Sequence, residues 1–122
     1  MCSRILIVDD DIAVASGMAE LFQREGYNLA VAQNGSEALY CINSSFNPDM
    51  IILDLNMPLM DGYQFRSAQL MEVSLSSIPV VVLSASALSA KQTDQLNCPI
   101  VLAKPVSWPV VREAVRRLCP HR

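Results

Sequence analysis

Residues 48–62 read PDMIILDLNMPLMDG, and this stretch decides the fold. Its apolar run, Met50–Leu53, is continuous rather than alternating, and Asp54 follows it directly. Short continuous runs of aliphatic residues are typical of strands that are covered on both faces, as in a parallel sheet. Four more apolar runs have a similar length: Ile5–Val8, Leu29–Ala32, Ile78–Leu83 and Ile100–Ala103. The chain therefore predicts five strands.

The segments between these runs are long enough for helices that cross from one strand to the next. We expect helices at residues 12–25, 36–42, 62–72, 87–96 and 107–118. In the first helix, one apolar stripe contains Val14, Met18, Leu21 and Phe22. Five repeats of strand and helix predict an α/β domain with a doubly wound, five-stranded parallel sheet and helices on both faces. A chain of 122 residues fits a single domain over residues 1–122.

Composition excludes several classes of protein. Hydrophobic residues make up 52% and charged residues 17%, whereas a disordered chain would be charged and poor in apolar residues. The net charge is −3 and the basic residues are scattered, which argues against nucleic-acid binding. No apolar run approaches the roughly 18 residues that cross a bilayer. We read no secretory signal peptide at the N-terminus, and we expect a cytoplasmic protein without membrane insertion.

Cysteine and histidine usage gives no sign of a zinc site or of a cysteine nucleophile. The sequence contains no C-x-x-C pair, and its only histidine, His121, is next to last. We expect the cysteines to be reduced, small apolar side chains. The four are Cys2, Cys41, Cys98 and Cys119.

Polar residues follow four of the five predicted strands. The first run ends in the aspartates 9–11, the third in Asp54, the fourth in Ser84 and the fifth in Lys104. Ligands of open α/β sheets bind beyond the carboxyl ends of the strands, so these side chains are expected to meet at one edge. Any one of these residues alone has an ordinary explanation, such as a helix cap, a turn or a surface lysine. Their placement at four strand ends favours a site.

Such a cluster suits phosphoryl chemistry with a hard cation. Crowded carboxylates repel one another, and Mg²⁺ binds through one or two carboxylates together with a phosphoryl oxygen. A carboxylate can attack phosphorus and hold the group as an acyl phosphate. A lysine ammonium beside it would stabilise the transferring group as a compact positive charge.

The chain resembles the receiver domains of two-component response regulators, and the resemblance covers essentially its whole length. The matching segments are Ile5–Asp11, Asn34–Leu39, Pro48–Gly62, Ile78–Ala85 and Lys104-Pro105. The stretch from Asp54 to Gly62 is the most specific of them. This resemblance implies the flavodoxin-like strand order 2-1-3-4-5. It also implies a switch or phosphoryl carrier rather than a turnover enzyme.

The resemblance assigns a role to each site residue. Asp54 would accept the phosphoryl group, Asp10 would bind Mg²⁺ directly and Asp9 would bind it through water. The backbone carbonyl of Asn56 would be a further metal ligand. Lys104 would contact the phosphoryl group and Ser84 would bond one of its oxygens. The Lys104-Pro105 bond is often cis in the family, and Pro58 and Gly62 would shape the loop after Asp54.

The implied phosphodonor is a phosphohistidine protein, either a histidine kinase or a histidine phosphotransfer protein. It would dock over the first helix near Val14, the Met57-Pro58 loop and Val106. The output partner is a protein that the sequence does not identify, and the chain is expected to be a monomer or a weak dimer.

Three departures from the family pattern stand out. Val101 occupies a position that usually holds Tyr or Phe, three residues before the lysine. The interval from Ser84 to Lys104 is short, and residues 97–99 read Asn-Cys-Pro in place of the usual Gly-Ala turn.

Two other functions remain open at this stage. A small Mg²⁺-dependent phosphatase of the aspartyl-phosphate type would use an Asp-x-Asp pair, whereas Asp54 is followed by Leu55 and Asn56. A flavodoxin-like cofactor binder would need a hydroxyl-rich phosphate loop, and three aspartates would repel an anionic phosphate.

Overall fold

A computed structural model describes residues 3–44, 46–57, 59–97 and 100–119. Its five strands form one parallel sheet in the order β2-β1-β3-β4-β5, which confirms the predicted fold class and strand order. The strands are β1 (Arg4–Val8), β2 (Asn28–Ala32), β3 (Met50–Asp54), β4 (Val80–Ser84) and β5 (Ile100–Ala103).

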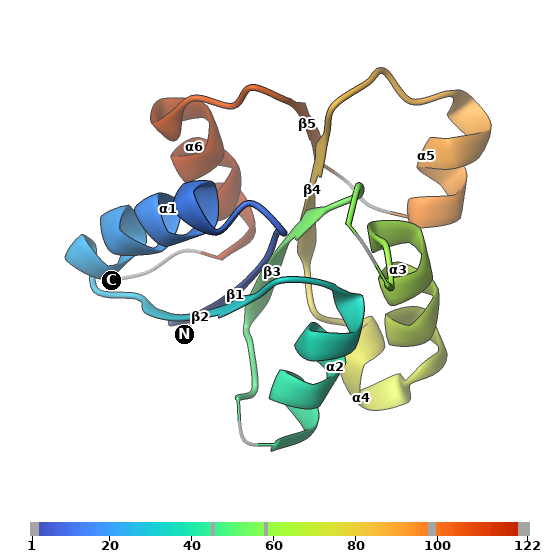
Figure 1. Ribbon diagram of the computed structural model, residues 1–122, viewed down its shortest axis with the longest axis horizontal. Coiled ribbons are helices and arrows are strands. Elements are labelled where there is room, and N and C mark those ends of the chain that lie inside the picture. The colour runs from blue at the N-terminus through green and yellow to red at the C-terminus, as the bar shows by residue number, and fades with distance from the viewer. Residues whose placement is uncertain (1–2, 45, 58, 98–99, 120–122) are drawn as a thin grey trace.

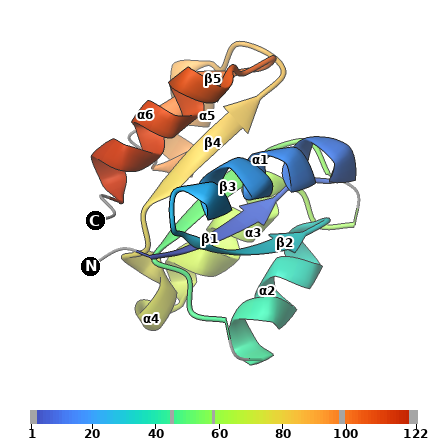
Figure 2. The ribbon, with the colours of Figure 1, turned by 90° about the vertical axis from the view of Figure 1, so that its left-hand side faces the viewer.

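Helices cover both faces of the sheet. One face carries α1 (Ile12–Arg24) and α6 (Trp108–Leu118). The other carries α2 (Gly35–Ser44), α3 (Gly62–Met71), α4 (Val73–Ser76) and α5 (Ala90–Leu96). Figure 1 shows this division with the sheet between the two groups, and Figure 2 shows α1 and α6 lying over the strands.

The continuous apolar runs explain why the sheet is buried on both sides. Along β1, Ile5 and Ile7 pack towards α1 and α6, while Leu6 and Val8 pack towards the opposite helices. All five residues of β3 and of β4 are buried, as expected for the central strands of a sheet covered on both faces.

Local signals set where the helices begin. The side chain of Asp11 caps α1 by accepting a hydrogen bond from the Val14 N–H, and Asp61 and Gln64 form a capping box at α3. Ser89 and Gln92 form a second capping box at α5. For that reason the fourth predicted helix begins at Ala90 and not at residue 87.

Three expectations about elements and cores were wrong in detail. Strand β4 begins at Val80, after Pro79, rather than at Ile78. The short helix α4 was not predicted, because its four residues are too few to show a helical period. Val14 does not belong to the buried stripe of α1, since Ala15, Met18, Ala19 and Phe22 fill it and Val14 is 46% exposed.

The expectation of four reduced cysteines is also wrong. Cys119 is disulfide-bonded, whereas Cys41 is free. A disulfide depends on which cysteines the fold brings together, and sequence spacing does not show this. Cys2 and Cys98 lie outside the described residues.

Candidate functional site

The carboxyl edge of the sheet brings the predicted site residues together. Asp54 and Ser84 are the last residues of β3 and β4, and Asp9 and Lys104 directly follow β1 and β5. Backbone hydrogen bonds continue the sheet into the site: the Asp9 N–H donates to the Ala32 carbonyl at 2.9 Å, and the Lys104 N–H donates to the Ser84 carbonyl at 2.8 Å. The side chains therefore project from a rigid frame.

Three carboxylates form the centre of the site. Asp9, Asp10 and Asp54 each offer an oxygen within 4.8 Å of the others. Asp9 and Asp54 are buried, whereas Asp10 is exposed, so the cluster opens to solvent on one side. This arrangement of hard oxygen ligands around an accessible position suits Mg²⁺.

Each buried carboxylate has one bonded and one orphaned oxygen. Asp9 Oδ1 accepts from the Asp11 N–H at 2.9 Å, and Asp54 Oδ1 accepts from the Asn56 N–H at 3.2 Å. Within the described part of the chain, the two Oδ2 atoms are buried and have no hydrogen-bond partner. A buried anionic oxygen without a partner is costly, so the site fits an added cation.

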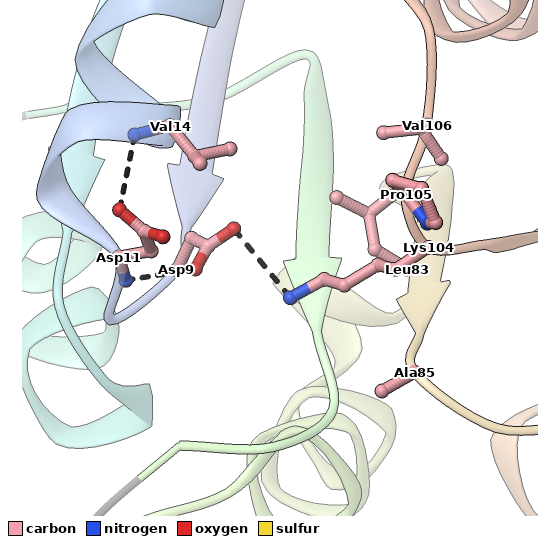
Figure 3. Close-up of a pocket in the computed structure, with 8 residues that line it drawn as sticks. All are labelled: Asp9, Asp11, Val14, Leu83, Ala85, Lys104, Pro105 and Val106. Atoms are coloured by element: carbon pink, nitrogen blue, oxygen red, sulfur yellow. Dashed lines mark hydrogen bonds and ion pairs between the residues drawn. The ribbon is translucent and has the colours of Figure 1, made fainter.

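Lys104 supplies the positive charge of the site. Its Nζ lies 3.0 Å from Asp54 Oδ1 and 4.0 Å from Asp9 Oδ2. Figure 3 shows the lysine side chain reaching from the end of β5 towards Asp9. One ammonium faces three carboxylates, and the cluster therefore keeps an excess of negative charge.

The pKa of Asp9 is raised from 3.8 to about 6, and burial of the carboxylate is the main cause. The Asp11 N–H and Lys104 lower this pKa, whereas the nearby Asp54 raises it. A divalent cation would favour the ionised form of Asp9, so metal binding and proton release are coupled at this site.

The remaining predicted residues surround the acidic centre. The Ser84 hydroxyl donates to the Ser86 carbonyl at 2.6 Å and accepts from the Ser86 N–H at 3.3 Å, so it is engaged with the β4–α5 loop. Asn56 and Asp10 line a hollow of about 370 Å³. The Lys104-Pro105 bond is cis, as the resemblance implies. Pro58 lies outside the described residues.

Gly62 allows the loop after Asp54 to fold back on the end of β3. A Cβ at this position would lie 2.7 Å from the Asp54 carbonyl oxygen and 2.7 Å from Leu55 Cα. The Gly62 N–H donates to the Leu55 carbonyl at 3.0 Å. Glycine is required here by the close approach of two backbone segments.

An apolar wall lies beside the acidic centre and includes Val14 and Val106, two residues that the sequence analysis places on the docking face. A cavity of about 350 Å³ lies between Asp9 and Val14 on one side and Lys104, Pro105 and Val106 on the other (Figure 3). A second hollow of about 220 Å³ shares Val14 and Val106 and continues between α1 and α6. We call these two hollows together the α1–α6 groove. From the sequence, Val14 is expected both on the apolar stripe of the first helix and on the docking face, and the structure places it at the groove.

No helix in the described ranges is both long enough and apolar enough to cross a membrane.

Comparisons with known proteins agree with this fold. The chain is 31% identical over 122 residues to sporulation initiation phosphotransferase F of Bacillus subtilis, covering 98% of this chain and 96% of that protein. It spans about half the length of several other curated relatives that it matches.

Two solved structures are similar over nearly the whole chain. One is the chemotaxis response regulator CheY4 of Vibrio cholerae, with a TM-score of 0.87 and 26% identity, covering 97% of this chain and 99% of that one. The other is the response regulator TrrA of Thermotoga maritima in complex with Mg²⁺-BeF, with a TM-score of 0.82 and 28% identity, covering 95% of this chain and 98% of that one. The family model of the response regulator receiver domain matches residues 5–116, and the chain belongs to this family of two-component signalling domains.

Proposed function

We propose that this chain accepts a phosphoryl group on Asp54 from a phosphohistidine protein, with Mg²⁺ as cofactor. The strongest support is the pair of buried, orphaned oxygens, Asp9 Oδ2 and Asp54 Oδ2, beside the Lys104 ammonium. A site with unmet negative charge on one side and an ammonium on the other can hold both a cation and a phosphoryl group. The similar TrrA structure contains Mg²⁺-BeF.

The residues would divide the work as follows. Asp10, Asp54 and the Asn56 carbonyl would hold Mg²⁺ directly and Asp9 through water, and the ion supplies positive charge against the phosphoryl oxygens. A carboxylate oxygen of Asp54 forms the new O–P bond while the P–N bond of the phosphohistidine breaks, and the electron pair stays on the imidazole nitrogen. Lys104 would then pair with the phosphoryl group.

Ser84 would stabilise the product. Its hydroxyl now donates to the Ser86 carbonyl, so bonding a phosphoryl oxygen requires the hydroxyl to exchange that acceptor. This exchange links the chemistry at Asp54 to the β4–α5 loop.

The phosphodonor would dock on the face that carries the site. Ile12 and Val14 are 44% and 46% exposed at the start of α1, and the α1–α6 groove extends from the acidic cluster. Either a histidine kinase or a histidine phosphotransfer protein could occupy this face with an apolar helix surface.

The proposal extends to the state of the protein. We expect residues 1–122 to act as one receiver domain in the cytoplasm, as a monomer or weak dimer, with a partner protein as its output. As a signalling switch it would modify itself rather than turn over an external substrate.

Intact mass spectrometry tests the assignment. After incubation with a small phosphodonor and Mg²⁺, one phosphoryl adduct should appear on the wild type and on the control Asp94→Asn, whose side chain is exposed on α5. Asp54→Ala should carry none. An undiminished adduct on Asp54→Ala would overturn the assignment, and sustained phosphate release from a soluble ester would favour the phosphatase instead.

A further inference from the structure

Helix α3 buries two long polar side chains away from the acidic site. Arg66 is 5% exposed and Gln69 is fully buried, both on the side of α3 that faces the protein interior. A buried guanidinium or amide destabilises a fold unless its polar atoms are hydrogen-bonded, so the partners of these groups indicate their role.

Arg66 binds the C-terminal end of α5. Its Nε donates to the Leu96 carbonyl at 2.7 Å and its Nη2 donates to the Asn97 carbonyl at 2.8 Å. Leu96 is the last residue of α5, and Asn97 ends the helix in a left-handed conformation with φ of 48°. The last carbonyls of a helix lack helical partners and carry partial negative charge, which a cation stabilises.

Gln69 extends this connection to the chain that enters β4. Its Oε1 accepts from Arg66 Nη1 at 2.8 Å, and its Nε2 donates to the carbonyls of Leu75 and Ile78 at 2.9 and 3.1 Å. We call the two side chains the Arg66–Gln69 clamp. It joins α3 to the end of α5 and to the segment before β4, and Figure 1 shows the end of α5 meeting α3.

The two ends of α5 are attached very differently. Leu96, at the C-terminal end, is the only buried residue of this helix. The first three residues, 90–92, are exposed, and the capping box of Ser89 and Gln92 is internal to the segment. Few buried contacts mean a low free energy of local opening, so the N-terminal half of α5 is the part that can move.

We infer that Arg66 is a positioning residue that anchors the C-terminal end of α5, so that the response to phosphorylation stays in the β4–α5 loop and the N-terminal half of this helix. The inference rests on the proposed function, because Ser84 must release the Ser86 carbonyl when Asp54 is phosphorylated. The loop from Ser84 to Ser89 then shifts, and α5 pivots about the clamp.

Hydrogen exchange of the metal-free protein tests the anchor by itself. In Arg66→Met, protection of the amides at residues 94–97 should fall at least tenfold relative to amides of β1 and β3, and in Arg66→Lys it should fall less, because lysine keeps the charge but loses the fork of donors. Arg24→Met removes an exposed arginine of α1 and should leave this protection unchanged. Unchanged protection in both Arg66 variants would overturn the anchor, and Arg66→Lys carries the test if Arg66→Met does not fold.

Amide spectra with Mg²⁺ and beryllofluoride, a phosphoryl mimic, test the pivot. In the wild type, shifts should extend over residues 84–93 and end before 95–97; in Arg66→Met they should spread to 95–97 and Val101, with shifts at residues 54–56 retained. Wild-type shifts at 95–97 as large as those at 86–89 would overturn the pivot. Failure of the proposed function would give a different result, since the amides of residues 54–56 would then not shift in any variant. That result would also contradict the pivot. The hydrogen-exchange experiment would still test the anchor, because it uses the metal-free protein.

Discussion

Two buried polar clusters in this molecule have opposite hydrogen-bonding states. In the acidic site, Asp9 and Asp54 each leave one buried oxygen without a hydrogen-bond partner among the described residues. In the Arg66–Gln69 clamp, the Gln69 amide uses its oxygen once and its nitrogen twice, and three nitrogens of Arg66 donate hydrogen bonds. Both clusters lie in the same small domain, so the difference is a property of each site.

We interpret the acidic site as one suited to binding a ligand, and the Arg66–Gln69 clamp as one that stabilises the fold. Unmet buried charge lowers stability, and a protein keeps it where a ligand restores the balance. Buried polar groups that are fully hydrogen-bonded specify how helices and strands pack. Removing one of these groups leaves its buried partners without a hydrogen bond, and the protein then loses stability. Deleting a polar group should therefore stabilise the metal-free acidic site and destabilise the clamp.

The largest effect is expected in the clamp. Gln69→Leu keeps the side-chain size but leaves Arg66 Nη1 and the carbonyls of Leu75 and Ile78 without this partner. The free energy of unfolding should fall by about 4 kcal/mol, because several buried groups, one of them charged, lose a hydrogen bond. Urea denaturation measures this change. Gln23→Leu, on the exposed face of α1, is the control and should stay within about 0.5 kcal/mol of the wild type. Equal effects of the two variants would remove the distinction between the clusters.

In the acidic site, removing a charge should raise the free energy of unfolding, and the pH dependence of stability should show this effect. The folded pKa of Asp9 is about 6, above its ordinary value of 3.8, so the folded protein binds more protons than the unfolded chain between these values. Protonated Asp9 therefore contributes about 3 kcal/mol to the free energy of unfolding. This contribution is fully present below about pH 4 and is lost as the pH rises through about 6.

Asp9→Asn isolates this contribution. In the presence of a chelator, the variant should gain stability relative to the wild type as pH rises from 4 to 7, as measured by urea midpoints. Saturating Mg²⁺ should reduce that gain, because the metal favours the ionised carboxylate. If the difference in the free energy of unfolding between Asp9→Asn and the wild type did not change with pH, Asp9 would not be the group whose pKa is raised in the folded state.

A smaller effect is expected for Asp10, the exposed carboxylate of the cluster. Asp10→Asn should weaken Mg²⁺ binding about tenfold, equivalent to about 1.4 kcal/mol, and should slow phosphorylation, while the metal-free fold gains stability from reduced repulsion. Trp108, which packs on Phe22 with ring centroids 4.7 Å apart and follows Lys104 by four residues, provides a fluorescence readout of the titration.

Asp11→Asn is the matched control for that titration. Asparagine caps a helix about as well as aspartate, and Asp11 caps α1 and is not a member of the cluster of Asp9, Asp10 and Asp54. Its Mg²⁺ affinity should stay near that of the wild type. If Asp10→Asn bound the ion as tightly as Asp11→Asn, Asp10 would not be a metal ligand.

Sequence reasoning reached the acidic site more easily than the clamp, for a physical reason. Apolar runs that end in Asp54, Ser84 and Lys104 encode both the strands and the positions of the polar groups, since parallel strands end at one edge. Arg66 and Gln69 lie on a helix, where a polar residue normally faces solvent, and their partners are carbonyls that carry no side-chain signal.

The same limit explains the other differences. The exposure of Val14 depends on the orientation of α1 about its own axis where it packs on the sheet. The disulfide at Cys119 depends on which cysteine lies close in space. A local sequence pattern predicts neither of them.

The smallest expected effect concerns how far a change at Asp54 spreads. With Mg²⁺ and beryllofluoride, amide shifts should concentrate at residues 54–60 and 84–90 and fade at Val101 and across α6. Val101 is β-branched and has few rotamers, so it transmits little movement. It borders a hollow of about 370 Å³ together with Ser84 and Thr93, which leaves room for Ser84 to change its hydrogen bonds without displacing β5.

Filling that hollow sharpens the test. Val101→Phe adds a ring beside Ser84 and should extend the shifts towards β5, whereas Val101→Ile adds one methylene group, keeps the branched Cβ and should not. Both variants should still form the adduct at Asp54, because Val101 lies outside the acidic cluster. Large wild-type shifts across Val101 and residues 108–118 would show that the response reaches the face of α6 without an aromatic ring. The β4–α5 loop would then transmit the conformational change to β5 and α6, and the change would not be confined to that loop.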